Sequence, residues 1–302
     1  MSAAAESDMV AEPIFGRVLT AMVTPFDPEG NVDLPRAREL ARRLVDEQGN
    51  DALVVNGTTG ESPTTSDDEK AEIVAAVVAE VGERAQVIAG VGTNDTRHCT
   101  HIAQMAVDAG AHALLVVTPY YSRPPQRGIL RHFLTLADAL PLPIMAYDIP
   151  HRAGVPIEPE TLLAMSKHPN IVAVKDAKGD LGSSSRVIAE STLTYYAGDD
   201  ALTLPMLSIG GAGVVGTSTH FTGRRTREMI DAFLAGRLDE SLALHQSLLP
   251  LYSGVFATQG VMLVKAGLAH QGFEVGGVRL PLPEPTEAEV AAFAALLDAA
   301  DL

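Results

Sequence analysis

Short apolar runs that alternate with helix-length connections constrain the fold of this chain more than any other sequence feature. Each run has five or six residues and is rich in small or branched apolar side chains, which is typical of strands buried on both faces. Between the runs, apolar residues recur at helical spacing, and no hairpin signal joins one run to the next. The runs occupy residues 18–23, 52–56, 86–91, 113–117, 143–147, 171–175, 193–197 and 213–217.

Eight strands with a helix-sized segment after each favour one kind of α/β fold, the (β/α)8 TIM barrel. An open, doubly wound sheet is the alternative, although no glycine-rich dinucleotide fingerprint follows the first strand. Helical patterns continue after the eighth unit, and a chain of 302 residues has room for them. We therefore predict a disordered tail over 1–13, a barrel over 14–236 and a C-terminal helical region over 237–302.

The charge and composition of the chain limit its partners. A formal net charge of −16 repels nucleic-acid backbones and anionic lipid surfaces, so neither is an expected partner. No apolar run approaches the length of a membrane span, and the N-terminal stretch lacks the apolar core of a signal peptide. The single cysteine, Cys99, excludes an internal disulfide framework and a cysteine-rich zinc site. These features predict a soluble, cytoplasmic protein.

Polar residues follow the predicted strands at the end of the barrel where such folds place their active sites. Hydroxyl groups, phenols, one arginine and one lysine are expected to converge on this rim. The stretches are GTTGES (57–62), TPYY (118–121), YDIPHRAG (147–154), VKDA (174–177), GDDA (198–201) and STH (218–220).

Lys175 directly follows the apolar run Ile171–Val174, and this position suits a reactive amine. Burial disfavours the ammonium form, so a lysine at the barrel mouth can lose its proton near neutral pH and attack a carbonyl to form a Schiff base. The alternatives are a lysine that reaches out to solvent and one paired with Asp176. Two other lysines compete: we expect Lys178 to be solvated and Lys265 to be a helix-surface or packing residue.

Further hydroxyl groups and one guanidinium complete the predicted site. Tyr147 ends the neighbouring strand, where a phenol bonded to other hydroxyls can pass protons; packing is its alternative role. Thr58, Thr59 and Tyr121 are among the hydroxyls available. The glycines of GTTGES let backbone N–H groups approach a carboxylate closely. Arg152 matches a second carboxylate, although a surface salt bridge would explain it too.

Metal chemistry is a weaker alternative. Asp199 and Asp200 are possible ligands of a divalent cation, as in a metal-dependent aldolase, but few carboxylates or histidines follow the other strands to complete the shell. His98, Cys99 and His101 lie near the start of a predicted helix, where we expect them to form a solvated face. No metal site is therefore predicted.

The order and spacing of GTTGES, TPYY, YDIPHRAG and VKDA resemble the dihydrodipicolinate synthase and N-acetylneuraminate lyase family over roughly residues 15–300. The resemblance implies a pyruvate-dependent class I aldolase, a lyase built on a (β/α)8 barrel with a C-terminal helical extension. It implies that Lys175 forms an imine with pyruvate and that no separate cofactor takes part. It also implies a homotetramer, arranged as a dimer of dimers.

The same resemblance implies a role for each predicted site residue. Tyr147, Thr58 and Tyr121 would form a proton relay, with Tyr121 reaching into the site of a neighbouring subunit. A hydroxyl that holds the carboxylate and a floor near the reactive lysine would complete the pyruvate site. The residues implied are Thr59 for the carboxylate and Gly198 and the carbonyl of Val215 for the floor.

Arg152 separates the branches of the family. An arginine here is typical of the synthases, which condense pyruvate with L-aspartate 4-semialdehyde at the start of the diaminopimelate route to lysine. Another pyruvate-dependent aldolase, acting on a 2-keto-3-deoxy sugar acid or on 4-hydroxy-2-oxoglutarate, is the alternative, and a keto-acid sensor without turnover is a third. Asp148, His151 and the STH segment depart from the usual family pattern, which bears on the pocket of the second substrate.

The resemblance also bears on regulation. Lysine-inhibited relatives carry histidines and a glutamate where this chain has Asp67, Lys70 and His98, whereas Asn94 and Tyr120 are retained. A cation at Lys70 opposes the ammonium group of a lysine effector. We therefore predict weak or absent feedback inhibition by lysine.

Overall fold

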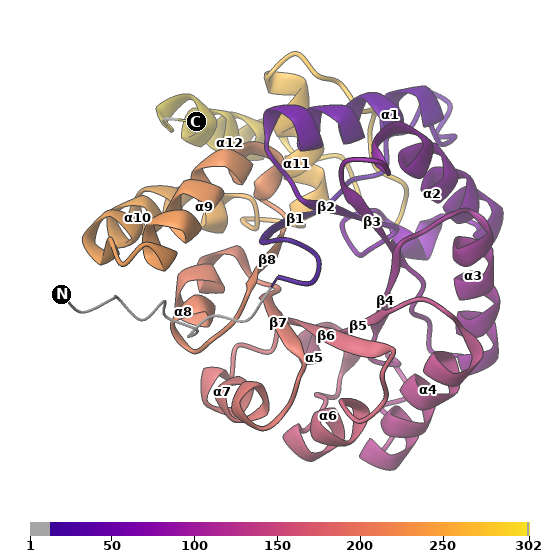
Figure 1. Ribbon diagram of the computed structural model, residues 1–302. Coiled ribbons are helices and arrows are strands. Elements are labelled where there is room, and N and C mark those ends of the chain that lie inside the picture. The colour runs from indigo at the N-terminus through magenta and orange to yellow at the C-terminus, as the bar shows by residue number, and fades with distance from the viewer. Residues whose placement is uncertain (1–12, 301) are drawn as a thin grey trace.

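The predicted strands form a closed, all-parallel barrel in sequence order (Figure 1). The computed structural model describes residues 13–300 and 302, so the tail predicted over 1–13 lies outside the described residues apart from Pro13. Each apolar run forms one strand, with ends that differ from the prediction by two residues at most. The closed barrel confirms the (β/α)8 fold and excludes the open sheet. The strands are β1 (Val18–Ala21), β2 (Ala52–Val55), β3 (Gln86–Gly90), β4 (Ala113–Val117), β5 (Ile144–Asp148), β6 (Ile171–Asp176), β7 (Thr194–Ala197) and β8 (Gly213–Gly216).

Helices follow the strands and surround the barrel on its outside (Figure 1). Local capping chemistry sets where they begin: before α2, the Ser66 hydroxyl accepts the Glu69 N–H, and the Glu69 carboxylate accepts the Ser66 N–H. The helical elements up to residue 234 are α1 (Leu34–Arg42), η1 (Arg43–Glu47), η2 (Ser62–Thr64), α2 (Asp67–Val81), α3 (Thr96–Asp108), α4 (Gln126–Ala139), α5 (Pro150–Ala153), α6 (Pro159–Met165), α7 (Leu181–Glu190), η3 (Asp200–Leu202), α8 (Thr203–Ser208) and α9 (Thr219–Leu234).

Alternation along each strand decides which side chains enter the barrel. In β6, Ala173 belongs to the apolar cluster inside the barrel, and Val174 belongs to the cluster between the strands and the helices. Lys175 follows with the inward direction of Ala173, whereas Asp176 faces outward to α7. The register pairs Lys175 with Tyr147 of β5, another member of the inner cluster. Two predicted site residues therefore meet at the mouth of the barrel.

Three further helices follow the barrel and lie beside α9 in Figure 1. Their apolar side chains join the cluster that covers the outer face of the strands, and Phe293 meets Phe221 of α9 edge-on with 5.7 Å between ring centroids. The division between the barrel and a helical region at residue 237 stays a prediction. The helices are α10 (Leu238–Gly254), α11 (Gly260–His270) and α12 (Glu287–Ala299).

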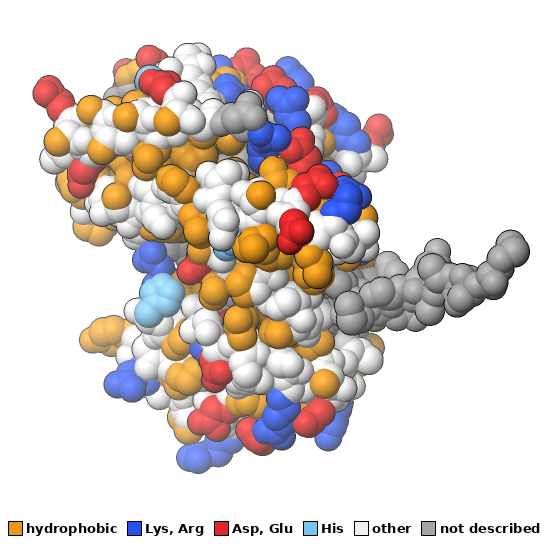
Figure 2. Space-filling model, turned by 90° about the vertical axis from the view of Figure 1, so that its left-hand side faces the viewer, with side chains coloured by type: hydrophobic (Ala, Val, Ile, Leu, Met, Phe, Trp, Pro, Cys, Tyr) orange, Lys and Arg blue, Asp and Glu red, His pale blue; other side chains and the backbone are white. Residues whose placement is uncertain are grey.

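The helix α10 buries only one side against its neighbours within the described residues. Figure 2 shows the side of the molecule where α10 lies, with hydrophobic side chains spread among polar ones. Leu238 and Leu242 are exposed there, whereas Leu248 and Leu251 are buried. None of the helices between residues 13 and 300 is both long and apolar enough to cross a membrane.

Candidate active site

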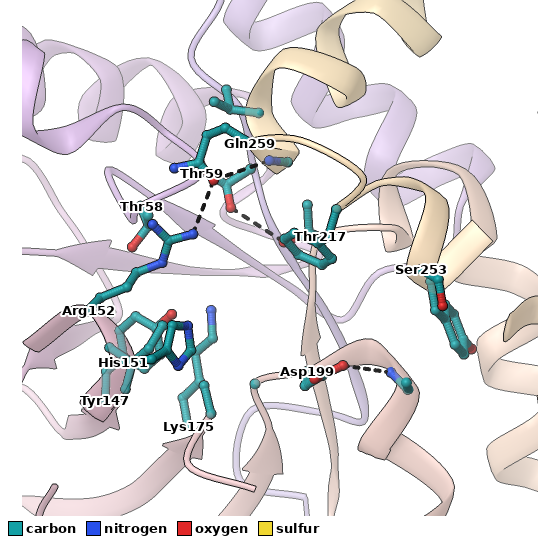
Figure 3. A pocket seen from close by; sticks show the side chains of 18 residues that line it. Thr58, Thr59, Tyr147, His151, Arg152, Lys175, Asp199, Thr217, Ser253 and Gln259 are labelled. Carbon is teal, nitrogen blue, oxygen red and sulfur yellow. Dashed lines mark hydrogen bonds between the residues drawn. The ribbon is translucent and has the colours of Figure 1, made fainter. Parts of the chain in front are cut away.

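A cavity of about 410 Å³ opens at the mouth of the barrel, between the carboxyl ends of the strands and the connection from α10 to α11. Figure 3 shows side chains from both regions pointing into it. A concave site with a few convergent polar groups is where a small substrate is expected to bind. The predicted residues among its lining are Thr58, Thr59, Tyr147, Arg152, Lys175 and Gly198.

Lys175 is buried in this cavity, with only 5% of its surface exposed. Its Nζ lies 4.4 Å from the centroid of the Tyr147 ring. Burial lowers the pKa of the amine to about 8; the charge of Asp200 opposes this effect, and the charge of Arg152 adds to it. At such a pKa, roughly a tenth of the amine is neutral at pH 7, far more than for a solvated lysine. Lys175 therefore has the protonation behaviour that a nucleophilic amine requires.

The predicted alternative partner of Lys175 lies elsewhere. Asp176 faces α7, where its carboxylate accepts the Ser184 hydroxyl and the Lys178 N–H. The expectation that Lys178 is solvated is wrong, because its side chain is only 12% exposed and its ammonium lies 3.6 Å from the Asp148 carboxylate. Burial raises the pKa of Asp148 to about 6, against an opposing backbone hydrogen bond and the Lys178 charge. Lys178 and Asp148 thus form a pair outside the lining of the cavity.

Tyr147 brings a phenol to the side of Lys175. Burial raises its pKa to about 12, opposed by the charge of Arg152 and by a hydrogen bond with Thr58. The phenol therefore keeps its proton at neutral pH and can donate it to an oxygen formed beside the amine. The structure places two of the three predicted relay residues, Tyr147 and Thr58, in contact with one cavity.

The loop that carries Thr59 after β2 has a conformation that few residues adopt. Asn56 and Glu61, on either side of the loop, have φ angles of 57° and 55°, in the left-handed region. A Cβ on Gly60 would lie 3.1 Å from the Asn56 backbone nitrogen, so any larger residue there would require the backbone to shift. The Thr59 hydroxyl lies 3.4 Å from the Thr217 hydroxyl at the end of β8 (Figure 3). Two hydroxyls therefore stand together on this side of the cavity.

Arg152 lies on the short helix α5, directly after β5, and its guanidinium points into the cavity (Figure 3). Its Nη2 donates to the Oε1 of Gln259 over 3.1 Å. An amide oxygen leaves the charge of the guanidinium uncompensated, so the group can still bind a carboxylate. His151, one of the predicted departures from the family pattern, lines the same cavity.

Tyr121 and Val215 do not line the cavity of their own chain. Tyr121 is 89% exposed and has a φ of 71°, so its phenol stands on the surface. Val215 lies in β8 and belongs to the apolar cluster inside the barrel. Gly198 does line the cavity, and a Cβ there would lie 3.0 Å from the Asp176 carbonyl oxygen. The roles of Tyr121 and Val215 stay predictions.

Sequence reasoning missed one wall of the cavity. This wall comes from the end of α10 and the connection to α11, and neither periodicity nor a motif relates that segment to the strand ends. Thr217 was missed as well, although its place just after β8 was a signal that could have found it. The missed residues of the wall include Tyr252, Ser253, Phe256 and Gln259.

The carboxylates of Asp199 and Asp200 both accept hydrogen bonds from backbone N–H groups. Asp199 accepts the Ala201 N–H, and the buried Asp200 accepts the backbone N–H groups of Thr217 and Ser218. Across the described residues, no group of three or more histidine, cysteine, aspartate or glutamate side chains is placed to hold a metal ion. Asp200 instead fixes the end of β8 and supplies negative charge near Lys175.

Two other predicted environments need correction. Cys99 is not part of a solvated face, because it is fully buried and burial raises the pKa of its thiol to about 12; His98 and His101 are exposed, as expected. Lys265 is not on the helix surface; it is buried, in keeping with the packing alternative, and it also forms an ion pair. Its ammonium lies 2.7 Å from the Glu61 carboxylate, and both side chains are almost fully buried.

A second cavity, of about 510 Å³, adjoins the first and shares Thr58, Tyr147 and Arg152 with it. Lys70 lines this cavity, and its ammonium donates to the carbonyl oxygen of Thr65. The other residues that the sequence analysis assigned to an effector site also line it. They are Asp67, Asn94, His98 and Tyr120.

Comparison with known proteins decides the family of the chain. Residues 14–300 match the family described as the dihydrodipicolinate synthetase family. The chain belongs to this family. Among relatives of the synthetase family, a protein of Cutibacterium acnes named 4-hydroxy-tetrahydrodipicolinate synthase is 59% identical over 97% of this chain and 100% of its own length.

Solved structures of the synthetase family share the fold closely. A dihydrodipicolinate synthase of Bacillus anthracis is 40% identical, with a TM-score of 0.92, over 94% of this chain and 98% of that one. A dihydrodipicolinate synthase of Cyanidioschyzon merolae, solved with lysine bound, is 39% identical, with a TM-score of 0.92, over 94% and 97% of the two chains. These matches confirm the resemblance that the strand-end motifs indicate, and with it the barrel and its helical extension.

Proposed function

We propose that the protein is a 4-hydroxy-tetrahydrodipicolinate synthase, a lyase that condenses pyruvate with L-aspartate 4-semialdehyde at the start of the diaminopimelate route to lysine. One observation carries the proposal: the buried amine of Lys175 and the guanidinium of Arg152 open into the same cavity. The first group matches a keto carbon and the second a carboxylate. Relatives that are 59% and 53% identical carry the synthase name. The alternative substrates, sugar acids and hydroxy-oxoglutarate, have no such support.

The reaction begins with the neutral amine of Lys175. The amine attacks C2 of pyruvate to give a carbinolamine, and loss of water then gives an imine. The phenol of Tyr147, hydrogen-bonded to Thr58, supplies the proton that the hydroxyl of the carbinolamine needs in order to leave as water. Thr59 and the backbone of its loop hold the pyruvate carboxylate.

Carbon–carbon bond formation follows on the same side of the cavity. Loss of a proton from C3 of the imine gives an enamine, whose C3 attacks the aldehyde carbon of aspartate semialdehyde. Arg152 holds the carboxylate of that second substrate. The amino group of the adduct then attacks C2, which closes the ring and releases Lys175 by transimination. No metal or organic cofactor takes part, because the imine itself withdraws the electrons.

The assembly and location of the protein also belong to the proposal. Tyr121, which stands exposed on its own chain, completes the proton relay of a neighbouring subunit in a tetramer built as a dimer of dimers. Gly198 and the carbonyl of Val215 form the floor of the pyruvate site. The charge of −16 and the biosynthetic role suit the cytoplasm.

Reductive trapping tests the proposal directly. Borohydride in the presence of pyruvate converts an imine to a stable secondary amine, and peptide mass mapping then locates it. We expect the adduct on Lys175, with turnover of aspartate semialdehyde and none of sugar aldehydes. An adduct on Lys178 or Lys265, or no adduct at all, would contradict the proposed function.

A further inference from the structure

Helix α11 touches the catalytic cavity through its first turn. Gln259 precedes the helix, and its Oε1 accepts both the Gly260 N–H over 3.2 Å and the Nη2 of Arg152 over 3.1 Å. The two partners in the second bond are 107 residues apart in the sequence. A residue of the C-terminal region therefore fixes the direction of the guanidinium (Figure 3).

Arg152 depends on such a contact because of where it lies. The side chain is long and exposed, and α5 is a helix of only four residues. A guanidinium that binds a carboxylate through two parallel N–H groups must hold its plane at one angle. A neutral amide oxygen can occupy one N–H without cancelling the charge, so the remaining N–H groups stay free for a ligand.

The helix is also tied to the loop that carries Thr58 and Thr59. Lys265 of α11 pairs with Glu61 over 2.7 Å and donates to the Gly277 carbonyl over 2.6 Å. The other Glu61 oxygen accepts the Arg279 N–H over 2.9 Å. A buried ion pair contributes little net stability, so its placement calls for another reason. Here it holds Glu61, which has a left-handed φ and ends the Thr58–Thr59 loop.

We propose that α11 is a positioning element that fixes Arg152 relative to the Thr58–Thr59 loop. Gln259 is the positioning residue for the second substrate. The helix thus contacts both parts of the site that bind a carboxylate. Gln259, at its N-terminus, holds the Arg152 guanidinium, and Lys265, within the helix, holds the Thr58–Thr59 loop through Glu61. The spacing between the two carboxylates of the reacting pair is therefore set by a segment outside the barrel. This inference rests on the proposed function, because it names aspartate semialdehyde as the ligand that Arg152 receives.

Two substitutions of Gln259 separate this role from simple helix capping. In Gln259→Ala the guanidinium loses its partner, and we expect the KM for aspartate semialdehyde to rise about tenfold, as for the loss of one charge-assisted hydrogen bond. In Gln259→Glu the new carboxylate binds Arg152 and competes with the substrate, so this KM should rise at least as much. If Gln259 only capped the helix, Gln259→Glu would not raise the KM for aspartate semialdehyde, because an acidic residue at a helix N-terminus is favourable.

The controls make the outcome decisive. Gln271→Ala, at the exposed far end of the same helix, should leave both KM values within twofold of wild type. The KM for pyruvate should stay unchanged in both Gln259 variants, and the rate of borohydride trapping should stay unchanged in Gln259→Ala, which adds no charge near Lys175. If the Gln259 variants keep the wild-type KM for aspartate semialdehyde, or if the KM rises equally for both substrates, the inference is overturned. The proposed function still stands in that case, provided that the wild-type protein turns over aspartate semialdehyde. A wild-type protein that traps pyruvate but makes no product with aspartate semialdehyde overturns both.

Discussion

Lys175 and Tyr147 face each other across the β5–β6 pair, with the lysine Nζ 4.4 Å from the centroid of the tyrosine ring. The register alone brings them together, because both side chains point into the barrel at paired positions. The ring covers the amine on one side, and the phenol keeps its proton at neutral pH, as the proposed relay requires. Burial acts in opposite senses on the two groups: it lowers the pKa of Lys175 and raises that of Tyr147.

The pH dependence of turnover should report the pKa of Lys175. The neutral amine is the active form, so kcat/KM for pyruvate should rise as the pH increases through about 8. Asp200 raises this pKa and Arg152 lowers it. We therefore expect Asp200→Asn to move the rising limb to lower pH and Arg152→Ala to move it to higher pH. Limbs that stay in place in both variants, measured from pH 6 to 10, would show that another group controls the rate.

Removal of the guanidinium should damage one substrate only. In Arg152→Ala the carboxylate of aspartate semialdehyde loses a charge-assisted contact, so its KM should rise about 10- to 100-fold. Borohydride trapping of pyruvate at saturating concentration should still occur, because Lys175 and the Thr58–Thr59 loop are unchanged in this variant. Steady-state kinetics with each substrate varied in turn make the comparison, and a matching loss of pyruvate binding would argue against the assignment of Arg152 to the second substrate.

Tyr121 can be tested by subunit complementation. Tyr121→Phe and Lys175→Ala should each lose most activity when expressed alone. Co-expression in the proposed assembly should give mixed dimers in which one site has an intact Lys175 from one subunit and an intact Tyr121 from the other. We expect activity to return in the mixed protein, to at most a fraction of wild type. Persistent inactivity of purified mixed dimers would mean that the phenol does not act across an interface.

Lysine should be a poor inhibitor of this protein. The ammonium of Lys70 already donates to the Thr65 carbonyl in the second cavity, where it repels another cation. Burial lowers the pKa of Lys70, opposed by the charges of Asp67 and Glu69. We expect no loss of turnover at millimolar lysine and no heat of binding by calorimetry. Inhibition at sub-millimolar lysine would contradict the prediction.

The ion pair of Lys265 and Glu61 should be more costly to break than to replace. Lys265→Met leaves a carboxylate buried without its cation, and we expect about 3–5 kcal/mol less free energy of unfolding. Glu61→Gln combined with Lys265→Met removes both charges, so much of that loss should be recovered. Urea denaturation of the three proteins gives the comparison. A double variant as unstable as Lys265→Met would show that the charges themselves are not the cause.

Local pattern predicted the barrel and the residues that the strands place directly. The apolar runs gave each strand within two residues, and the positions at their ends singled out Lys175 and Tyr147, which the structure pairs across β5 and β6. Contacts between distant segments could not be found in this way. Gln259 reaches Arg152, and Lys265 reaches Glu61, through the folding of the C-terminal helices against the barrel. Neither contact leaves a periodic trace in the sequence.

One wall of the cavity comes from the α10–α11 connection and not from the barrel. Activation of pyruvate and choice of the aldehyde can therefore depend on different segments of the chain. The groups that we propose activate pyruvate stand on strand ends and on the loop after β2, where a change would disturb the rigid barrel. Phe256 and its neighbours lie on a connection between helices, which tolerates substitution more readily. Preference for one aldehyde over another can therefore be altered, by evolution or by design, while the carbon nucleophile is still generated in the same way.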